Sequence, residues 1–180
     1  MTMTIRNLRI FGALLLLTSV ALAQEITRES PKQSRDVFTV AQSENDLSMF
    51  VTALQSSGMV KMLREEGPFT LFALSNRAFA NLPKGDMEAL LSNRAAMHVL
   101  LAHYIVRGSI SGSDTEGLSS ARTMAGVKLR IDIRSEGYYV NGAEFEGNGI
   151  NCANGVIYVL DRFDPGLLHD AVALAEKDKR

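Results

Sequence analysis

Residues 67–83 read GPFTLFALSNRAFANLP, and this stretch indicates more about the fold than any other part of the chain. Its opening Gly-Pro pair predicts a turn that ends a preceding helix. The next six residues are apolar at nearly every position, which predicts a short strand covered on both faces. Ser75 or Asn76 can then cap a helix by accepting hydrogen bonds from its first backbone N–H groups, and Pro83 ends that helix. The stretch therefore predicts a buried strand followed directly by a helix, and it contains no catalytic motif.

Helices are predicted on both sides of this stretch. Asp46 can cap a helix whose apolar residues share one face and which ends at Gly58. Residues 59–63 predict a second short helix. Farther along, Asp86 and Asn93 each precede a run of residues with helical apolar spacing.

Beyond residue 126 the spacing of the apolar residues changes from that of a helix to that of a strand. Residues 127–133 alternate between apolar and charged side chains, which predicts a strand with one face in solvent. Turns at Ser135-Glu136-Gly137, at Asn141-Gly142 and at Ala153-Asn154-Gly155 divide the rest into further short strands. Helices therefore come first and strands later, which indicates an α+β domain.

The two ends of the chain differ from its middle. Residues 1–23 have a basic start, an apolar stretch and a small-residue cleavage site, which predicts a secretory signal peptide; a retained membrane anchor is the alternative. Residues 24–35 are polar and predict a flexible leader. Residues 36–165 make up one domain, and residues 166–180 predict an amphipathic helix that docks onto the domain or lies on a membrane surface.

Charge and cysteine content restrict the class of partner. The chain has a net charge of −1, and loss of Arg6 and Arg9 with the signal peptide leaves −3. A weakly acidic surface argues against nucleic acid as the partner. Cys152 is the only cysteine, so no internal disulfide can form.

Four segments together resemble the fasciclin-like domain. They are residues 67–83, LAHYIVRG at 101–108, YVNGA at 139–143 and NGVIYVLD at 154–161, in the family's order and spacing. The resemblance covers about residues 34–165. It implies a compact α+β fold, a wedge-shaped β-sandwich with helices packed around one side. It also implies adhesion or interaction outside the cell, without a general catalytic activity.

The chain departs from the family pattern at three places. Ala73-Leu74-Ser75-Asn76 stands where the family usually has Ala-Pro-Thr-Asn, and Tyr158 stands where it commonly has histidine. The family's Tyr-His pair, which binds cell surfaces in some animal members, is reversed here. The resemblance therefore makes His103 and Tyr104 the candidate partner-binding residues. Because neighbours on a strand point to opposite faces, the alternative is that Tyr104 lies in the core with its hydroxyl satisfied and His103 lies near the surface.

Catalytic and metal-binding patterns are missing from the sequence. The three histidines, His98, His103 and His169, do not have ligand spacing, and Cys152 most simply packs as a small hydrophobe. Acids such as Asp161 and Glu144 are explained by solvated strand ends, and Lys84-Gly85-Asp86 by a turn and a helix cap. We expect no enzyme activity, no cofactor and no metal.

Two functions remain open. The first is an exported interaction or adhesion module, periplasmic or extracellular, that binds a protein, glycan or matrix partner through its surface. The alternative is a carrier of an apolar small molecule such as a carotenoid, which some fasciclin-like proteins bind. The chain's eight methionines would suit an apolar groove that can repack, although Met59, Met62, Met87 and Met97 also fit ordinary core positions and Met1 and Met3 leave with the signal peptide.

Overall fold

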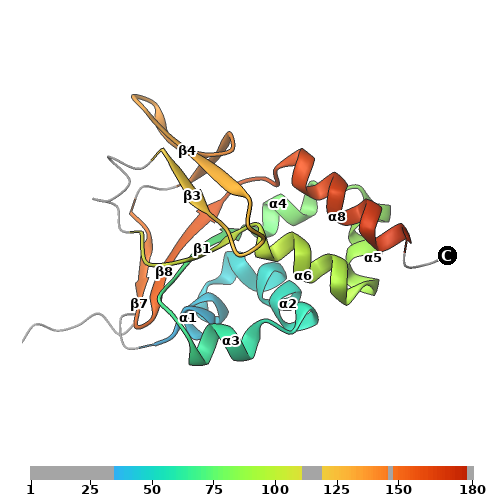
Figure 1. Ribbon diagram of the computed structural model, residues 1–180, viewed down its shortest axis with the longest axis horizontal. Coiled ribbons are helices and arrows are strands. Elements are labelled where there is room, and N and C mark those ends of the chain that lie inside the picture. Colours follow the sequence, from blue (N-terminus) through green and yellow to red (C-terminus); the bar gives the residue numbers. More distant parts are fainter. Residues whose placement is uncertain (1–34, 111–118, 146–147, 178–180) are drawn as a thin grey trace, which may run out of the picture. The chain divides into compact units, whose positions relative to one another are not determined.

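The computed structural model describes residues 35–110, 119–145 and 148–177, all within one compact unit (Figure 1). The predicted signal peptide and nearly all of the predicted leader lie outside the described residues. Within the described part, no helix is long and apolar enough to cross a membrane.

The N-terminal helices are capped differently from the prediction. They are α1 (Val37–Ser43), η1 (Asn45–Leu47), α2 (Ser48–Ser57) and α3 (Val60–Glu65). The prediction that Asp46 caps α2 is wrong, because Asp46 lies inside the short 3-10 turn η1. The side-chain oxygen of Asn76 accepts the Met49 N–H instead, at 2.9 Å, so the cap comes from a distant segment. The predicted end at Gly58 is confirmed by its φ of 78°.

The opening stretch folds as predicted, with one shifted helix start after it. Strand β1 (Phe69–Leu74) is buried at all six positions, and the Ser75 hydroxyl accepts the Ala78 N–H to cap α4 (Asn76–Ala80). Asn93 caps α6 (Arg94–Ala102) as predicted. Helix α5 (Lys84–Ser92) starts two residues before Asp86, directly after Pro83, so Lys84-Gly85-Asp86 is a first helical turn and not a separate turn with a cap.

The strands form one continuous sheet. Besides β1 they are β2 (Ile105–Arg107), β3 (Ser120–Arg122), β4 (Lys128–Arg134), β5 (Gly137–Val140), β6 (Ala143–Phe145), β7 (Ile150–Cys152) and β8 (Gly155–Leu160). Their order is β2-β1-β8-β6-β5-β4-β3, with β7 also paired to β8. Strands β1 and β8 are parallel and central. A bridge between Val106 and Thr123 joins the two ends of this order, so the sheet curls back on itself.

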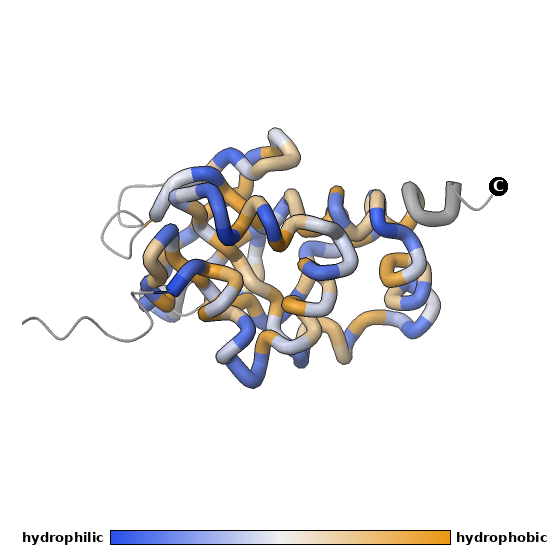
Figure 2. Tube along the Cα trace, turned by 90° about the horizontal axis from the view of Figure 1, so that it is seen from below, coloured by the Kyte–Doolittle hydropathy of each residue, from blue (hydrophilic) through white to orange (hydrophobic). Residues whose placement is uncertain are grey.

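Helices and strands occupy different sides of this unit. Figure 1 shows the helices gathered beside the curled sheet, with α8 (Pro165–Lys177) next to α5. Figure 2 shows hydrophobic residues along the inner strands and helix faces, and hydrophilic ones at the outer turns. Helix α8 packs on α5 and α6 and buries Ala171, so it docks onto the domain, which is one of the two alternatives for this segment. The predicted α+β architecture is confirmed.

Two details of the strand prediction need correction. Leu129 and Ile131 of β4 are buried as predicted, but Val127 and Ile133 are 41% and 42% exposed, because the first precedes the strand and the second lies toward its hairpin tip. The turn between β7 and β8 consists of Ala153-Asn154, and Gly155 is already the first residue of β8.

Asn154 connects three separate segments of the chain. Its Oδ1 accepts the Val37 N–H at 2.8 Å, and its Nδ2 donates to the carbonyl oxygens of Leu63 and Glu66 at 2.8 and 2.7 Å. Its own backbone oxygen accepts the Phe69 N–H at 2.9 Å. One side chain therefore fixes the start of α1 and the end of α3 against the β7–β8 turn.

Asn154→Ala should lower the free energy of unfolding by about 3 kcal/mol, because it removes three hydrogen bonds to backbone groups, two of them part-buried. Urea unfolding followed by circular dichroism measures the loss. Asn151→Ala, at an exposed position in β7, is the matched control and should change stability by less than about 0.5 kcal/mol. A similar small loss for both variants would contradict the proposed connection.

Candidate binding groove

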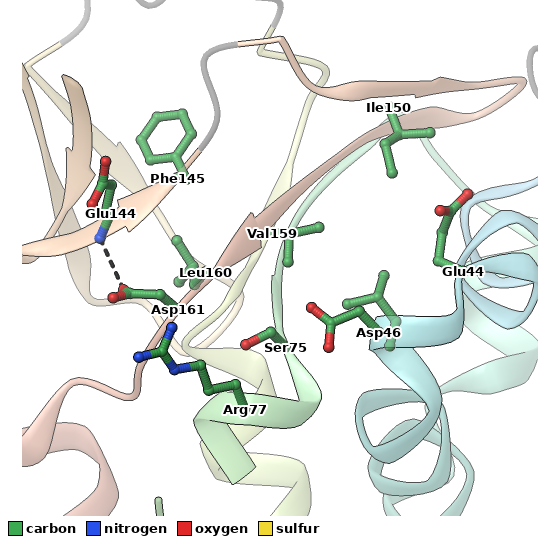
Figure 3. Close-up of a pocket in the computed structure, with 11 residues that line it drawn as sticks. Glu44, Asp46, Ser75, Arg77, Glu144, Phe145, Ile150, Val159, Leu160 and Asp161 are labelled. Carbon is green, nitrogen blue, oxygen red and sulfur yellow. Dashed lines mark hydrogen bonds between the residues drawn. The ribbon is translucent and has the colours of Figure 1, made fainter. Parts of the chain in front are cut away.

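A groove of about 580 Å³ opens between η1 and the strands β6 and β8 (Figure 3). Its floor is apolar, and its rim carries side chains of both charges. The floor residues are Leu47, Phe145, Ile150, Val159 and Leu160. The rim residues are Glu44, Asp46, Ser75, Arg77, Glu144 and Asp161.

Four segments that are separate in the sequence build this rim, and one of them is Glu144 in β6. Glu44 and Asp46 follow α1, and in Figure 3 they face the groove from the helical side. Arg77 extends from the first turn of α4, and its guanidinium lies on the opposite side, near Asp161. Asp161 follows β8, where its Oδ1 accepts the Glu144 N–H and the Arg162 Nε–H, both at 3.1 Å. The rim is therefore mainly acidic, with one cation among the carboxylates.

The groove has the chemistry of a binding site. Of the described residues that line the groove, Ser75 alone carries a hydroxyl, and that hydroxyl is buried and caps α4. No histidine lines the described part of the groove, and the Ser75 hydroxyl already accepts the Ala78 N–H. Among the described residues, no group of three or more His, Cys, Asp or Glu side chains could hold a metal ion. The groove can bind a ligand by apolar contact and charge.

His103 and Tyr104 do not lie on a strand, contrary to the prediction. His103 is the C-cap of α6, and its Nδ1 lies 2.7 Å from the Val99 carbonyl oxygen one turn earlier, so this nitrogen donates. The ring thus folds back on its own helix and is only 9% exposed, and the prediction that it lies near the surface is wrong. Tyr104 is 1% exposed, which confirms the alternative that places it in the core. Partner binding by these two residues stays a prediction.

The Tyr104 hydroxyl takes part in a polar network at the start of α8. It accepts the Asp164 N–H at 2.8 Å. The Asp164 carboxylate in turn accepts the Gly166 N–H and the Asn141 side-chain amide, at 2.9 and 2.8 Å. Asp164 is therefore a helix cap and not merely a solvated acid. Burial, and to a lesser degree the Asp164 carboxylate, raise the pKa of the Tyr104 hydroxyl well above its ordinary value.

This raised pKa predicts a specific loss of stability at high pH. The native state holds the Tyr104 proton more tightly than the unfolded chain does, so its contribution is complete below pH ~10 and declines above it, by up to about 1.4 kcal/mol per pH unit. Tyr104→Phe removes this decline. The difference in unfolding free energy between wild type and Tyr104→Phe should therefore shrink between about pH 10 and pH 12, as urea titrations will measure. Parallel pH profiles would contradict the assignment.

The other residues considered from the sequence lie in structural positions. Tyr158 is buried and donates to the Ile110 carbonyl oxygen at 2.8 Å. His98 Nδ1 lies 3.3 Å from the Ser57 carbonyl oxygen, and His169 is exposed on α8. Cys152 is half-buried against the core. Sequence reasoning missed Glu44, Asp46 and Arg77 as groove residues, because no local pattern shows that their segments meet.

A family model matches the chain over most of its described length. The model is that of the fasciclin domain, and it matches residues 45–163, which include β1, the His103–Tyr104 corner and β8. The chain belongs to the fasciclin domain family. The fold and the four resembling segments are thereby confirmed as those of a fasciclin domain.

Relatives of this fasciclin domain protein occur in bacteria and animals. An uncharacterised protein of Synechocystis, sll1735, is 32% identical over 70% of this chain and 94% of its own length. The transforming growth factor-beta-induced protein ig-h3 of Oryctolagus cuniculus is 28% identical over 71% of this chain and 19% of its own length. A FAS1 domain pair from the insect cell adhesion molecule fasciclin I superposes with a TM-score of 0.66 at 14% identity, covering 76% of this chain and 53% of that one. The structural likeness shows the shared fold.

Proposed function

We propose that this fasciclin domain protein is an exported, non-catalytic interaction module that binds a protein, glycan or matrix partner through its surface. The groove is the observation that carries the proposal. Its apolar floor and charged rim suit contact with a partner, and its one hydroxyl is occupied as a helix cap. The structural relative from a cell adhesion molecule supports the same role.

Export and the place of action form part of this proposal. Residues 1–23 carry the three parts of a secretory signal, which supports release into a periplasm or the extracellular space. His103 remains a candidate contact residue, whereas Tyr104, at 1% exposed, could affect binding only by holding the start of α8.

Binding to an array of glycans and matrix proteins tests the proposed interaction function. The protein without residues 1–23 should bind a defined subset of the array. Asp46→Lys and Arg77→Glu reverse charges at the groove rim and should each weaken that binding by about tenfold, because a rim charge pair contributes up to about 1 kcal/mol and reversal adds repulsion. Lys84→Gln, on α5, is the control and should bind like wild type. Unchanged binding by both rim variants would remove the groove from the proposal.

A second candidate function, carriage of an apolar small molecule, is favoured by the apolar floor. Expression in a carotenoid-producing strain tests it, since a carrier should purify with bound pigment. Ile150→Glu, which puts a charge on the half-buried floor, should abolish pigment retention. A colourless wild-type protein would exclude this candidate and leave the interaction module unaffected.

A further inference from the structure

A row of cations runs across the outer face of the sheet. In the pairing of β3 with β4, Arg122 lies directly opposite Lys128, and Ser120 lies opposite Arg130. The side chains of directly paired residues point to the same face. Ala121 and Leu129, the pair between them, are buried, so Arg122, Lys128 and Arg130 point outward, and all three are exposed.

Strand β2 adds a fourth cation to this face. The antiparallel bridge between Val106 and Thr123 places β2 beside β3, and both bridge residues are buried. One residue farther along the same register, Arg107 comes opposite Arg122, on the exposed face. Neighbouring strands lie about 4.8 Å apart, so Arg107, Arg122 and Lys128 form a line across three strands. We call Arg107, Arg122, Lys128 and Arg130 the basic row; Figure 1 shows β3 and β4 side by side at this end of the sheet.

Acidic side chains of the fold neutralise only some of the positive charges in the basic row. Arg107 pairs with Glu66 at 3.1 Å, and Arg130 pairs with Asp132 at 2.8 Å; both arginines are 60% or more exposed. The Arg107–Glu66 pair is exposed at both partners and is therefore weak, whereas the Asp132 side chain is 23% exposed and also lies 3.8 Å from Arg134. Arg122 donates to the Gly126 carbonyl oxygen at 3.0 Å, which leaves its charge uncompensated. Lys128 has no ion pair with any residue in the described ranges.

Like charges directly opposite each other destabilise a sheet. Arg122 and Lys128 occupy such a pair, and Arg107 extends it, in a chain whose net charge is −1. Arg107 pairs with Glu66 and lies over the Phe69 ring, but neither Arg122 nor Lys128 has an ion pair among the described residues, so a bound anion would relieve the repulsion between these two. The row lies on an open face, and the groove of Figure 3 contains none of its members. An extended ligand with several anionic groups fits this arrangement better than one small ion in a pocket.

We propose that the basic row binds a linear anionic polysaccharide that carries carboxylate or sulfate groups. The inference deepens the proposed interaction function and rests on it, since a glycan partner belongs to the space outside the cell. Guanidinium groups recognise carboxylate and sulfate oxygens through paired N–H donors, and the row offers three of them. Single-stranded nucleic acid fits less well, because it needs free aromatic rings for base stacking. Tyr139 lies opposite Asp132 on this face. The Arg134 guanidinium is 4.8 Å from the centroid of its ring, so a face of this ring is already covered.

Binding to immobilised heparin, with neutral dextran as the blank, tests this proposal. Wild-type protein should bind heparin at an ionic strength of about 0.15 M and should not bind dextran. The double variant Arg122→Gln/Lys128→Gln should bind roughly tenfold more weakly, from the loss of two exposed charges. The matched control, Lys84→Gln/Arg94→Gln, removes the same charges from α5 and α6 and should keep wild-type affinity. Thermal unfolding of all three proteins confirms that each is folded.

Each other outcome overturns the inference. Equal weakening in the two double variants would show that net charge and not the basic row governs binding. No heparin binding by folded wild type, or tighter binding to a single-stranded RNA of the same length, would exclude the polysaccharide. These results leave the proposed function standing if the array still reports a partner that depends on Asp46 and Arg77. Loss of array binding with heparin binding intact would instead overturn the groove alone.

Discussion

Gly155→Ala should lower the free energy of unfolding by more than about 4 kcal/mol. Gly155 begins β8 beside Phe69 of the parallel strand β1, with φ at 153°. A Cβ at this position would clash with the Phe69 carbonyl oxygen, which belongs to the backbone and cannot rotate away. The variant therefore combines an unfavourable backbone conformation with a clash between the two central strands.

Gly85→Ala provides the control for this substitution. Gly85 lies in α5, and a Cβ there would meet no atom within 4 Å. Since alanine favours the helix over glycine, this variant should gain about 0.5–1 kcal/mol. Soluble yield and urea unfolding compare the two variants. A loss below about 1 kcal/mol for Gly155→Ala would mean that β1 and β8 are farther apart than the structure shows.

Tyr104→Ala should cost about 3–5 kcal/mol, as expected for truncation of a buried aromatic side chain. The ring is 1% exposed and lies edge to face with Phe163, at a centroid distance of 6.2 Å. The substitution leaves a cavity and also frees the Asp164 N–H at the start of α8. Unfolding monitored by near-ultraviolet circular dichroism is suitable, because the aromatic signal reports this packing.

His103→Ala is the natural comparison, since it alters the adjacent residue. It removes one hydrogen bond, to the Val99 carbonyl oxygen within the same helix, and should cost only about 1 kcal/mol. Reduced partner binding by a stable His103→Ala protein would support its candidate role. Equal and small losses in stability for the two variants would show that Tyr104 does not occupy the core.

Local signals in the sequence predict the parts of this fold that depend on neighbouring residues. The caps at Ser75 and Asn93, the end of α2 at Gly58 and the turn at Asn141-Gly142 follow from residue type alone, and all four are confirmed. Asn141 shows why: its φ of 49° is one that asparagine tolerates and most residues avoid.

Residue type and local spacing do not predict the contacts between distant segments. Asp46 has the residue type and spacing of a cap for α2. Asn76, from another element, accepts the Met49 N–H and caps α2 instead. Strand alternation predicts opposite orientations for His103 and Tyr104, but these residues lie where α6 ends, so the strand rule does not apply. The groove likewise requires knowing that η1 faces β6 and β8, which only the tertiary structure shows.

The Asn154 contacts set an order for the folding of this chain. Val37, at the start of α1, is held by a residue 117 positions later, and β1 pairs with β8 across a shorter but still long span, as in Phe69 opposite Gly155. A chain emerging from the ribosome lacks these partners until synthesis is almost finished, and pairing at such separation is slow. The nascent polypeptide therefore stays largely unstructured while its N-terminal residues are already accessible. Late folding would allow a translocation channel that accepts only unfolded chains to transport this protein. This agrees with the export signal predicted at residues 1–23.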